Sequence, residues 1–349
     1  MGIRQRRAGS AVTLLDVARH AGVSPMTASR VINRHPRVSA TMRERVEASI
    51  QALGYRPNLA GRSLRTAGLA RIGVLYSNPS AAYLNQFMLG VLERSSLEGC
   101  QVLVEKSEDS DSQRAATERL LDAGADGLIL PPPLCESKAI VGAFVEAGIP
   151  VVAIASSRFS DKVSCVRIDD RRASHDMVSH LIAHGHTRIG YITGDPNQTA
   201  SAHRWQGYRD ALAEAGIGYD AALVQAGDFT YRAGLEAAER LLALQPRPSA
   251  IFASNDDMAS AVVSVAHRRR LKVPEDLSVV GFDDTSASTM VWPELTTIHQ
   301  PVADMTDAAI DLLLREIRQA AGAERVSVNH VVPHRLITRD SVSRPLLDR

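Results

Sequence analysis

The stretch TLLDVARHAGVSPMTASRVIN, residues 13–33, decides how the N-terminal part of this 349-residue chain folds. It opens with a threonine that has an acidic residue three positions later, a near capping box for a helix starting at Leu14. Leu14, Val17, Ala18 and Ala21 recur at the spacing of one helical face. The segment therefore begins with a short amphipathic helix.

A second helix follows after a three-residue turn. Gly22 stops the first helix, and Ser24-Pro25 places a capping residue before a proline at the first helical position. Ala28, Val31 and Ile32 form its inward stripe. The opposite face collects Pro25, Met26, Ser29, Arg30 and Asn33.

A third helix completes the unit. It is predicted to start at Ser39, to stop at Gly54 and to bury its apolar residues Met42, Val46, Ile50 and Leu53. Three short helices with a glycine-containing turn between the first two form a helix-turn-helix, whose second helix presents its N-terminal residues to base edges. Arg30 can bind guanine through two hydrogen bonds, worth about 1–3 kcal/mol of discrimination. A small helical bundle with a polar outer face is the alternative.

The charge of the chain supports DNA binding. Residues 1–66 hold twelve Arg, no Lys and three acidic residues, a net charge of +9, whereas the remainder holds 28 basic and 36 acidic residues, a net charge of −8. A basic head on an acidic body indicates a module for a polyanion joined to a part with another task.

These head motifs resemble those of the lactose-repressor/galactose-repressor family of bacterial regulators. The matching segments are Val12–Ala18, Ala21–Ser24 and Thr27–Asn33, followed by Leu53–Asn58 and Ala60–Leu64, which match the family's linker. From the outer face and the resemblance together, the expected DNA contacts are Thr13, Ser24, Pro25, Met26, Thr27, Ser29, Arg30, Asn33, Arg34, Tyr55, Asn58, Arg62 and Leu64.

The linker is expected to be a conditional helix. Residues 57–64 make about two turns, too few for an isolated helix in water, and Gly61 weakens them further. The segment is expected to form a helix when it packs against a symmetry mate and DNA. The resemblance implies that Leu64 enters the minor groove at the operator centre, where such a wedge bends DNA. A plain flexible tether is the alternative.

The body, from residue 71, alternates apolar runs with amphipathic helical stretches, which predicts βαβ units with parallel sheets. About 270 residues exceed one ordinary domain, so we expect two doubly wound lobes. The expected strands are Ile72–Tyr76, Val102–Glu105, Gly127–Leu130, Val151–Ala155, Val166–Ile168, Ile189–Ile192, Ala250–Ala253 and Val279–Phe282.

Ligands of open parallel sheets bind beyond the carboxyl ends of the strands, where this chain carries polar and aromatic residues. Amide, carboxylate and guanidinium groups suit vicinal hydroxyls, and aromatic rings suit the apolar face of a sugar. The expected effector contacts are Asn78, Tyr83, Arg158, Gln198, Arg204, Phe229, Asn255, Asp283 and Trp292.

The body resembles the same family and the type I periplasmic sugar-binding fold behind it. The matching motifs are His184–Gly190, Arg204–Tyr208, Ser254–Asp256, Val280–Asp284 and Leu295–Pro301. Carried over from the family, Arg204, Asn255 and Asp283 would contact the effector, and Phe229 and Tyr83 would stack on it.

The chain departs from the family at two positions. The family often ends the strand at Val151–Ile154 with an aspartate, but here Ala155 and then Arg158 follow, so one sugar hydroxyl loses a partner or Arg158 meets a negative group. Leu84 stands where purine-binding relatives carry an aromatic ring, which disfavours a purine corepressor.

Other classes of protein are disfavoured. There is no apolar run of about 18 residues for a membrane span, no signal-peptide pattern and no phosphate-binding loop. Three distant cysteines give no disulfide framework or zinc spacing, so we expect a cytoplasmic protein with reduced thiols, no metal and no cofactor. His180, His184 and His186 lack further ligands, and the pairs Asp256-Asp257 and Asp283-Asp284 suit hydrogen bonding better than catalysis.

The predicted organisation is a basic arm (1–10), a helix-turn-helix domain (11–56), a hinge (57–70), a core (71–340) and a tail (341–349). Within the core, the N-lobe is expected at about 71–160 plus 293–322 and the C-lobe at about 161–292 plus 323–340.

The resemblance implies a dimeric, non-enzymatic transcription regulator, most often a repressor of carbohydrate-utilisation genes, with a palindromic operator and a small sugar effector. Three alternatives stay open: a purine or phosphorylated effector, a sugar receptor without a regulatory role, and a sugar-processing enzyme fused to a DNA-binding head. Induction versus corepression, and dimer versus tetramer, are also open.

Overall fold

The computed structural model describes residues 12–32, 38–53, 69–157, 162–319 and 326–345, and the chain divides into two compact units, residues 1–68 and 69–349. In the described part of the chain, no helix is both long and apolar enough to cross a membrane. Several predicted features lie outside the described residues, namely the hinge helix and the candidate contacts Asn33, Arg34, Tyr55, Asn58, Arg62, Leu64 and Arg158.

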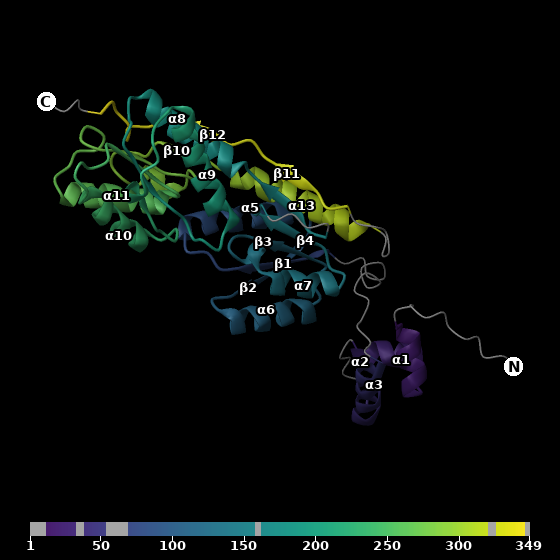
Figure 1. The fold of residues 1–349 in the computed structure, drawn as a ribbon. Helices are drawn as coiled ribbons and strands as arrows, with labels where there is room; N and C mark the ends of the chain where they lie inside the picture. Colours follow the sequence, from purple (N-terminus) through teal and green to yellow (C-terminus); the bar gives the residue numbers. More distant parts are fainter. Residues whose placement is uncertain (1–11, 33–37, 54–68, 158–161, 320–325, 346–349) are drawn as a thin grey trace. The chain divides into compact units, whose positions relative to one another are not determined.

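Within its described residues, the first unit has three helices, drawn in purple in Figure 1: α1 (Leu14–Ala21), α2 (Pro25–Ile32) and α3 (Ala40–Leu53). The predicted capping box is present, because the Asp16 carboxylate accepts hydrogen bonds from the Thr13 N–H (2.9 Å) and hydroxyl (2.6 Å). Gly22 ends α1 at φ 62°, a left-handed conformation that glycine adopts without strain. Ser24 caps α2 by accepting a hydrogen bond from the Thr27 N–H at 3.1 Å.

The core of this unit is small and apolar, and its buried members are Val17, Ala18, Ala21, Ala28, Val31 and Val46. The expected burial of Met42 is wrong, since its side chain is 43% exposed. Helix α3 has 14 residues, whereas α1 and α2 have 8 each, so its partners are too short to cover it from end to end.

The second unit holds two α/β lobes. The sheet of the first lobe has the order β11-β5-β4-β3-β1-β2, with all pairs parallel. Its strands are β1 (Arg71–Tyr76), β2 (Gln101–Lys106), β3 (Gly127–Leu130), β4 (Val151–Ile154), β5 (Ser164–Arg167) and β11 (Asn329–Val331).

Helices cover both faces of this sheet. In Figure 1, α5 and α13 lie on one face and α6 and α7 on the other. Their bounds, with the short η1, are α5 (Ala81–Leu97), α6 (Ser110–Asp122), η1 (Leu134–Glu136), α7 (Lys138–Glu146) and α13 (Val302–Arg318).

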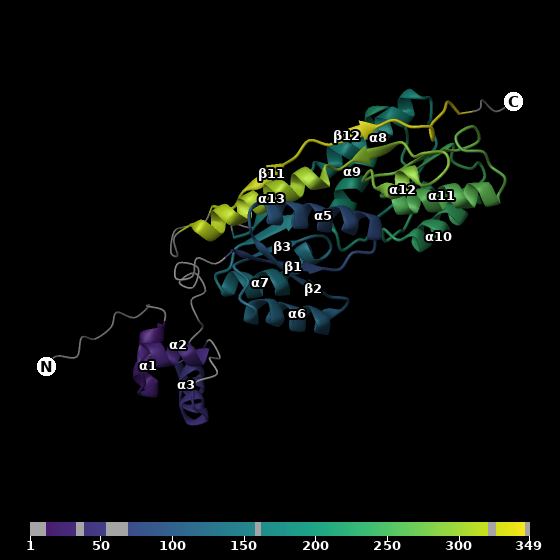
Figure 2. The ribbon, with the colours of Figure 1, turned by 180° about the vertical axis from the view of Figure 1, so that it is seen from behind.

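The second lobe has a four-stranded parallel sheet of order β7-β6-β8-β9. Helices α8 and α9 pack on each other, as do α10 and α11, and Figure 2 shows the two pairs from behind. The elements are α8 (Asp170–Ala183), β6 (Ile189–Ile192), α9 (Thr199–Glu214), η2 (Ala221–Leu223), β7 (Val224–Gln225), α10 (Tyr231–Leu242), β8 (Ala250–Ala253), α11 (Asp256–Arg268), β9 (Ser278–Val280) and α12 (Ser286–Thr289).

The chain crosses between the lobes three times: after β5, between β9 and α13, and between β11 and β12 (Arg335–Ile337). Strand β10 (Thr297–His299) lies on the second crossing and pairs antiparallel with β12. The predicted lobe boundaries are therefore wrong in places. Strands β5 and β11 belong to the first sheet, and residues 296–299 lie beside β9 and the residues that follow it.

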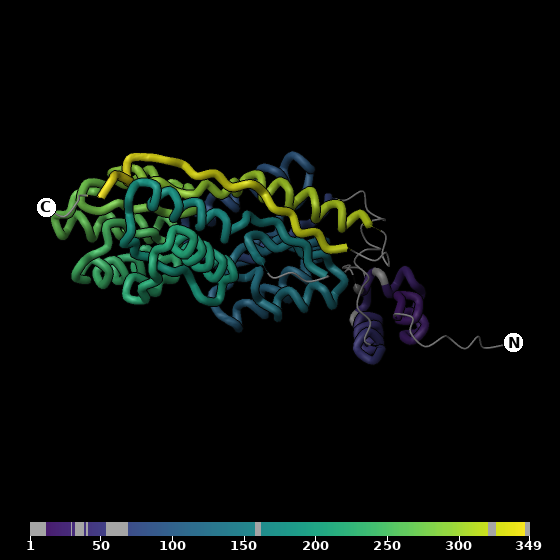
Figure 3. Tube along the Cα trace, turned by 45° about the horizontal axis from the view of Figure 1, so that its top comes forward, coloured from purple at the N-terminus to yellow at the C-terminus, as the bar shows by residue number. Residues whose placement is uncertain are grey.

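Residues 341–345 are also not a free tail. Ser341, which comes shortly after β12, is fully buried, and its hydroxyl donates a hydrogen bond to the Val279 carbonyl at 2.5 Å. The His186 imidazole bonds the Ser343 carbonyl oxygen at 2.8 Å. Figure 3 shows residues 326–345, in yellow, running from β11 in the first lobe to the second lobe, so neither lobe is a continuous piece of chain.

Candidate functional site

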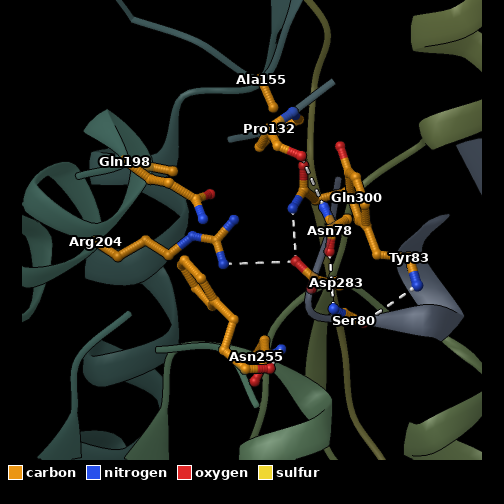
Figure 4. Close-up of a pocket in the computed structure, with 12 residues that line it drawn as sticks. Asn78, Ser80, Tyr83, Pro132, Ala155, Gln198, Arg204, Asn255, Asp283 and Gln300 are labelled. Atoms are coloured by element: carbon orange, nitrogen blue, oxygen red, sulfur yellow. Dashed lines mark hydrogen bonds and ion pairs between the residues drawn. The ribbon is translucent and has the colours of Figure 1, made fainter. Parts of the chain in front are cut away.

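A cavity lies between the two lobes, where the strands of both sheets end. It contains about 390 Å³ of space not filled by protein atoms, part of it open to solvent. Figure 4 shows its lining side chains converging from both lobes. The lining residues are Asn78, Ser80, Tyr83, Pro132, Ala155, Gln198, Ala200, Arg204, Phe229, Asn255, Asp283 and Gln300.

Most of the expected effector contacts meet in this cavity. Those that line it are Asn78, Tyr83, Gln198, Arg204, Phe229, Asn255 and Asp283. Trp292 does not line it: this residue lies past α12, before Pro293, and is 76% exposed. Gln300 was missed, although it directly follows β10 and its neighbour His299 pairs with Asp283.

Arg204 is the central cation of the cavity. Its Nε donates to Asp170 at 2.8 Å and its Nη1 to the Ser254 carbonyl at 2.5 Å, while Asp283 lies 3.5 Å from Nη1. The guanidinium also lies 3.6 Å from the centroid of the Phe282 ring. Burial opposes its charge, but Asp170 and Asp283 more than offset this and raise the pKa of Arg204 above its ordinary value. The cation therefore already has two carboxyl partners within the protein.

Asp283 is the carboxylate at the cavity wall. It follows β9 in a positive-φ conformation (109°), rare for a residue with a side chain, and Gln300 donates to its Oδ1 at 2.6 Å. Burial raises the pKa of Asp283 to about 7, against the opposing effects of Arg204 and Gln300. Near neutral pH this group therefore exists both as a carboxylic acid and as a carboxylate.

Two asparagines that we expected to bind effector hydroxyls already hold the backbone. Asn255 caps α11 by accepting from the Met258 N–H and donates to the Phe229 carbonyl at 2.9 Å. Asn78 likewise donates to the Pro132 carbonyl and accepts from the Ser80 N–H. Their amides shape the walls of the cavity, with Phe229 held at φ 70°.

Two buried polar atoms of the lining have no hydrogen-bond partner within the described residues: the Tyr83 hydroxyl and the Gln300 Oε1. Both side chains are almost fully buried. Buried polar atoms in folded proteins nearly always have a partner, which can be ordered water, so these two atoms can bond either water or a polar molecule in the cavity.

The first unit offers a separate exposed face. Pro25, Arg30 and Met26 are exposed on α2, Met26 by 66%. The hydroxyls of Ser24 and Thr27 bond each other at 2.8 Å beside the start of α2, and Thr13 belongs to the α1 cap. The side chain of Ser29 lies outside the described part. The N-terminal end of α2 thus presents one arginine and one long apolar side chain.

The histidine cluster and the acidic pairs have structural partners. His184 bonds the His180 carbonyl, and His186 bonds Ser249 and Ser343. Asp256 is fully buried and accepts hydrogen bonds from Thr297 and Thr285. Across the described ranges, no group of three or more His, Cys, Asp or Glu is arranged to hold a metal ion.

Comparison with known proteins identifies both units. Residues 13–58 match the model of bacterial regulatory proteins of the lacI family, and residues 178–342 match a periplasmic binding protein-like domain. The catabolite control protein A of Priestia megaterium is 34% identical over 333 residues, 95% of this chain and 99% of the relative. The ribose operon repressor of Escherichia coli K12 is 35% identical over 314 residues, 88% of this chain and 93% of the relative.

Solved structures agree along the whole length. The transcriptional regulator CelR in complex with cellobiose has a TM-score of 0.73 and 31% identity, covering 95% of this chain and 99% of that one. The lac repressor dimer bound to operator and the anti-inducer ONPF has a TM-score of 0.70 and 29% identity, covering 96% and 100%. The predicted family and fold class are confirmed: this chain belongs to the lacI family of bacterial regulatory proteins.

Proposed function

We propose that this chain is a transcriptional repressor that binds a two-fold symmetric operator as a homodimer and responds to a small uncharged sugar in the cavity between its lobes. The observation that carries the proposal is that one chain combines a basic helix-turn-helix unit with a cavity between two lobes, in which buried polar atoms have no partner among the described residues. Its relatives, which include a ribose operon repressor and a regulator solved in complex with cellobiose, support it. Its place of action is the cytoplasm, where operator DNA lies.

The first unit supplies the DNA contacts. A single helix-turn-helix reads few bases, so a dimer on a palindrome is required for specificity. Arg30 on the exposed face of α2 would donate to guanine, and Met26 would contact a thymine methyl group. We propose the remaining DNA contacts expected from the sequence for the same role.

The cavity favours an uncharged effector. Arg204 is the cation of its described lining, and Asp170, together with Asp283 in its carboxylate form, already balances that charge. A phosphorylated metabolite would bring at least one further negative charge next to these two carboxylates, which is unfavourable in a buried site. Sugar hydroxyls can instead both donate to the Gln300 Oε1 and bond the Tyr83 hydroxyl.

The cavity gives little support to a sugar-processing enzyme. Hydrolysis of a glycosidic bond generally needs two carboxyl groups that flank the bond. Asp283 is the one carboxyl group among the described residues of the lining. A sugar receptor without a regulatory role would leave the basic first unit without a task.

The test has a DNA arm and a sugar arm. The full-length chain is used to select binding sites from random duplexes, and neutral mono- and disaccharides are screened by thermal shift, since a bound ligand raises the melting temperature. Sugars that shift the melting temperature are then added to the chain on its selected duplex. A selected palindrome whose affinity changes with one of these sugars supports the proposal. Failure to select any palindrome in the presence or absence of the sugars contradicts it.

Variants separate the two arms. Arg30→Ala should weaken binding to the selected duplex by about 1–3 kcal/mol and leave the sugar-induced thermal shift unchanged. Arg19→Ala is the matched control, because it removes the same charge from an exposed side chain of α1. Equal losses for the two variants would show that only the charge of the unit matters and that Arg30 reads no base.

A further inference from the structure

Helix α9, which carries Arg204 and follows Gln198, has no capping residue of its own. Gln198 stands at its N-cap, but its side chain makes no capping hydrogen bond. The other long helices of the second lobe are capped by their own N-cap side chains: Asp169 for α8, Thr230 for α10 and Asn255 for α11. The N-terminus of α9 must therefore be satisfied in another way.

A side chain from the first lobe fills this role. The Glu136 carboxylate, in η1 after β3, accepts hydrogen bonds through Oε1 from the Thr199 hydroxyl at 2.6 Å and the Thr199 N–H at 3.3 Å. The Ser156 hydroxyl, also from the first lobe, donates to the same oxygen at 3.1 Å. The Ser157 N–H donates to the Thr199 hydroxyl at 3.0 Å. A carboxylate at a helix N-terminus is favourable both as an acceptor and as a charge.

These contacts join the lobes beside the cavity. Ser156 follows Ala155 of the lining, and Thr199 stands between the lining residues Gln198 and Ala200. Thr199, the first residue of α9, is thus held to the opposite lobe by Glu136 and by the Ser157 N–H.

We infer that Glu136 is a latch that couples closure of the two lobes to the order of the α9 N-terminus. When the lobes separate, α9 loses its capping acceptor and its first turn frays, which disorders the cavity wall at Gln198. When they close, capping and the assembly of that wall occur together. The inference relies on the proposed function only in treating the cavity as an effector site.

The test uses the full-length chain without any sugar, so its outcome is independent of the effector. Glu136→Ala removes the acceptor, and Thr199→Val removes the hydroxyl from the other side of the contact. Glu105→Ala is the control, because Glu105 pairs with Arg119 inside the first lobe. Hydrogen exchange at the amides of residues 199–202 should become about fivefold faster in the first two variants, the size expected for a lost cap. Exchange in the first turn of α11 should not change.

Lobe separation is measured in the same variants. Spin labels are attached at Glu118→Cys in α6 and Glu236→Cys in α10, in a Cys100→Ser background, and the labelled chain is diluted into excess unlabelled chain. Double electron–electron resonance then measures the distance between the lobes. Longer distances in both latch variants, with Glu105→Ala like the parent, support the latch. If either the exchange rates or the distances in Thr199→Val match those of the parent, the inference is overturned. Thr199→Val decides the outcome if Glu136→Ala does not fold.

Discussion

Replacing Gly207 by alanine is expected to destabilise the second unit, although alanine forms helices better than glycine. Gly207 lies within α9 where this helix packs on α8. A Cβ atom there would lie 2.1 Å from the Arg171 carbonyl oxygen and 2.9 Å from the His175 nitrogen. Both are backbone atoms and cannot rotate away, so the two helices would have to separate by roughly 1 Å to reach ordinary contact distances.

The expected size follows from two opposing effects. Alanine in a helix interior gains about 0.5–1 kcal/mol over glycine. Overpacking of a tight contact costs about 1–3 kcal/mol, and a backbone clash belongs at the upper end of that range. The separation would also stretch the 2.8 Å bond between Arg204 of α9 and Asp170 of α8. We expect a net loss of about 2 kcal/mol, or a melting temperature lower by about 4–8 °C.

The chain supplies a matched control in Gly142, which lies within α7 and would place its Cβ in open space, with no atom within 4 Å. Gly142→Ala should therefore raise stability by about 0.5–1 kcal/mol. Unfolding is followed by tryptophan fluorescence, since Trp205 and Trp292 are the two tryptophans of the chain and both lie in the second unit. Equal stabilisation by both substitutions would refute the close packing of α8 on α9.

Two further predictions concern the cavity. Because burial raises the pKa of Asp283 to about 7, its contribution to stability is full below about pH 4 and is lost as the pH rises through 7. Asp283→Asn resembles the protonated form, so its stability relative to the parent should rise by up to about 4 kcal/mol between pH 4 and 8. Urea-unfolding profiles of the two proteins that run parallel over this pH range would contradict the prediction. Tyr83→Phe removes a buried hydroxyl without a described partner, so it should raise the stability of the sugar-free chain by about 1 kcal/mol. The same variant should bind the sugar more weakly when affinity is measured by calorimetry. A loss of stability would mean that the hydroxyl has a partner within the protein.

Local sequence rules predicted the first unit well. The Thr13–Asp16 capping box, the stop at Gly22 and the start of α2 at Pro25 all depend on neighbouring residues, and all are present in the structure. The burial of Met42 was predicted wrongly because helical periodicity marks a face but not how far a partner helix extends along it. That information lies in the lengths of all three helices together.

The cavity was found by a rule of topology, which places ligands at the carboxyl ends of parallel strands. The rule does not tell which polar side chains remain available there. The side-chain amides of Asn78 and Asn255 already donate hydrogen bonds to backbone carbonyls of loops that only the folded chain brings near them. Gln300 faces the cavity through a pairing of Asp283 with His299, 16 positions apart, which no local pattern records.

The lobe boundaries failed for the same reason. Strand β11 adds to the edge of the first sheet beside β5, more than 160 residues earlier in the chain. All three residues of β11 are exposed, so the strand lacks the apolar pattern from which a sequence could indicate the sheet that it joins.

The discontinuity of both lobes bears on how the protein emerges from the ribosome. Helices α1, α2 and α3 of the first unit are complete once residue 53 has left the exit tunnel. The first sheet lacks its edge until β11 appears, and the second lobe lacks the Ser341 and Ser343 bonds to Val279 and His186 until residue 343 appears. A nascent or prematurely terminated chain would therefore carry a finished DNA-reading head without a finished sensor to control it.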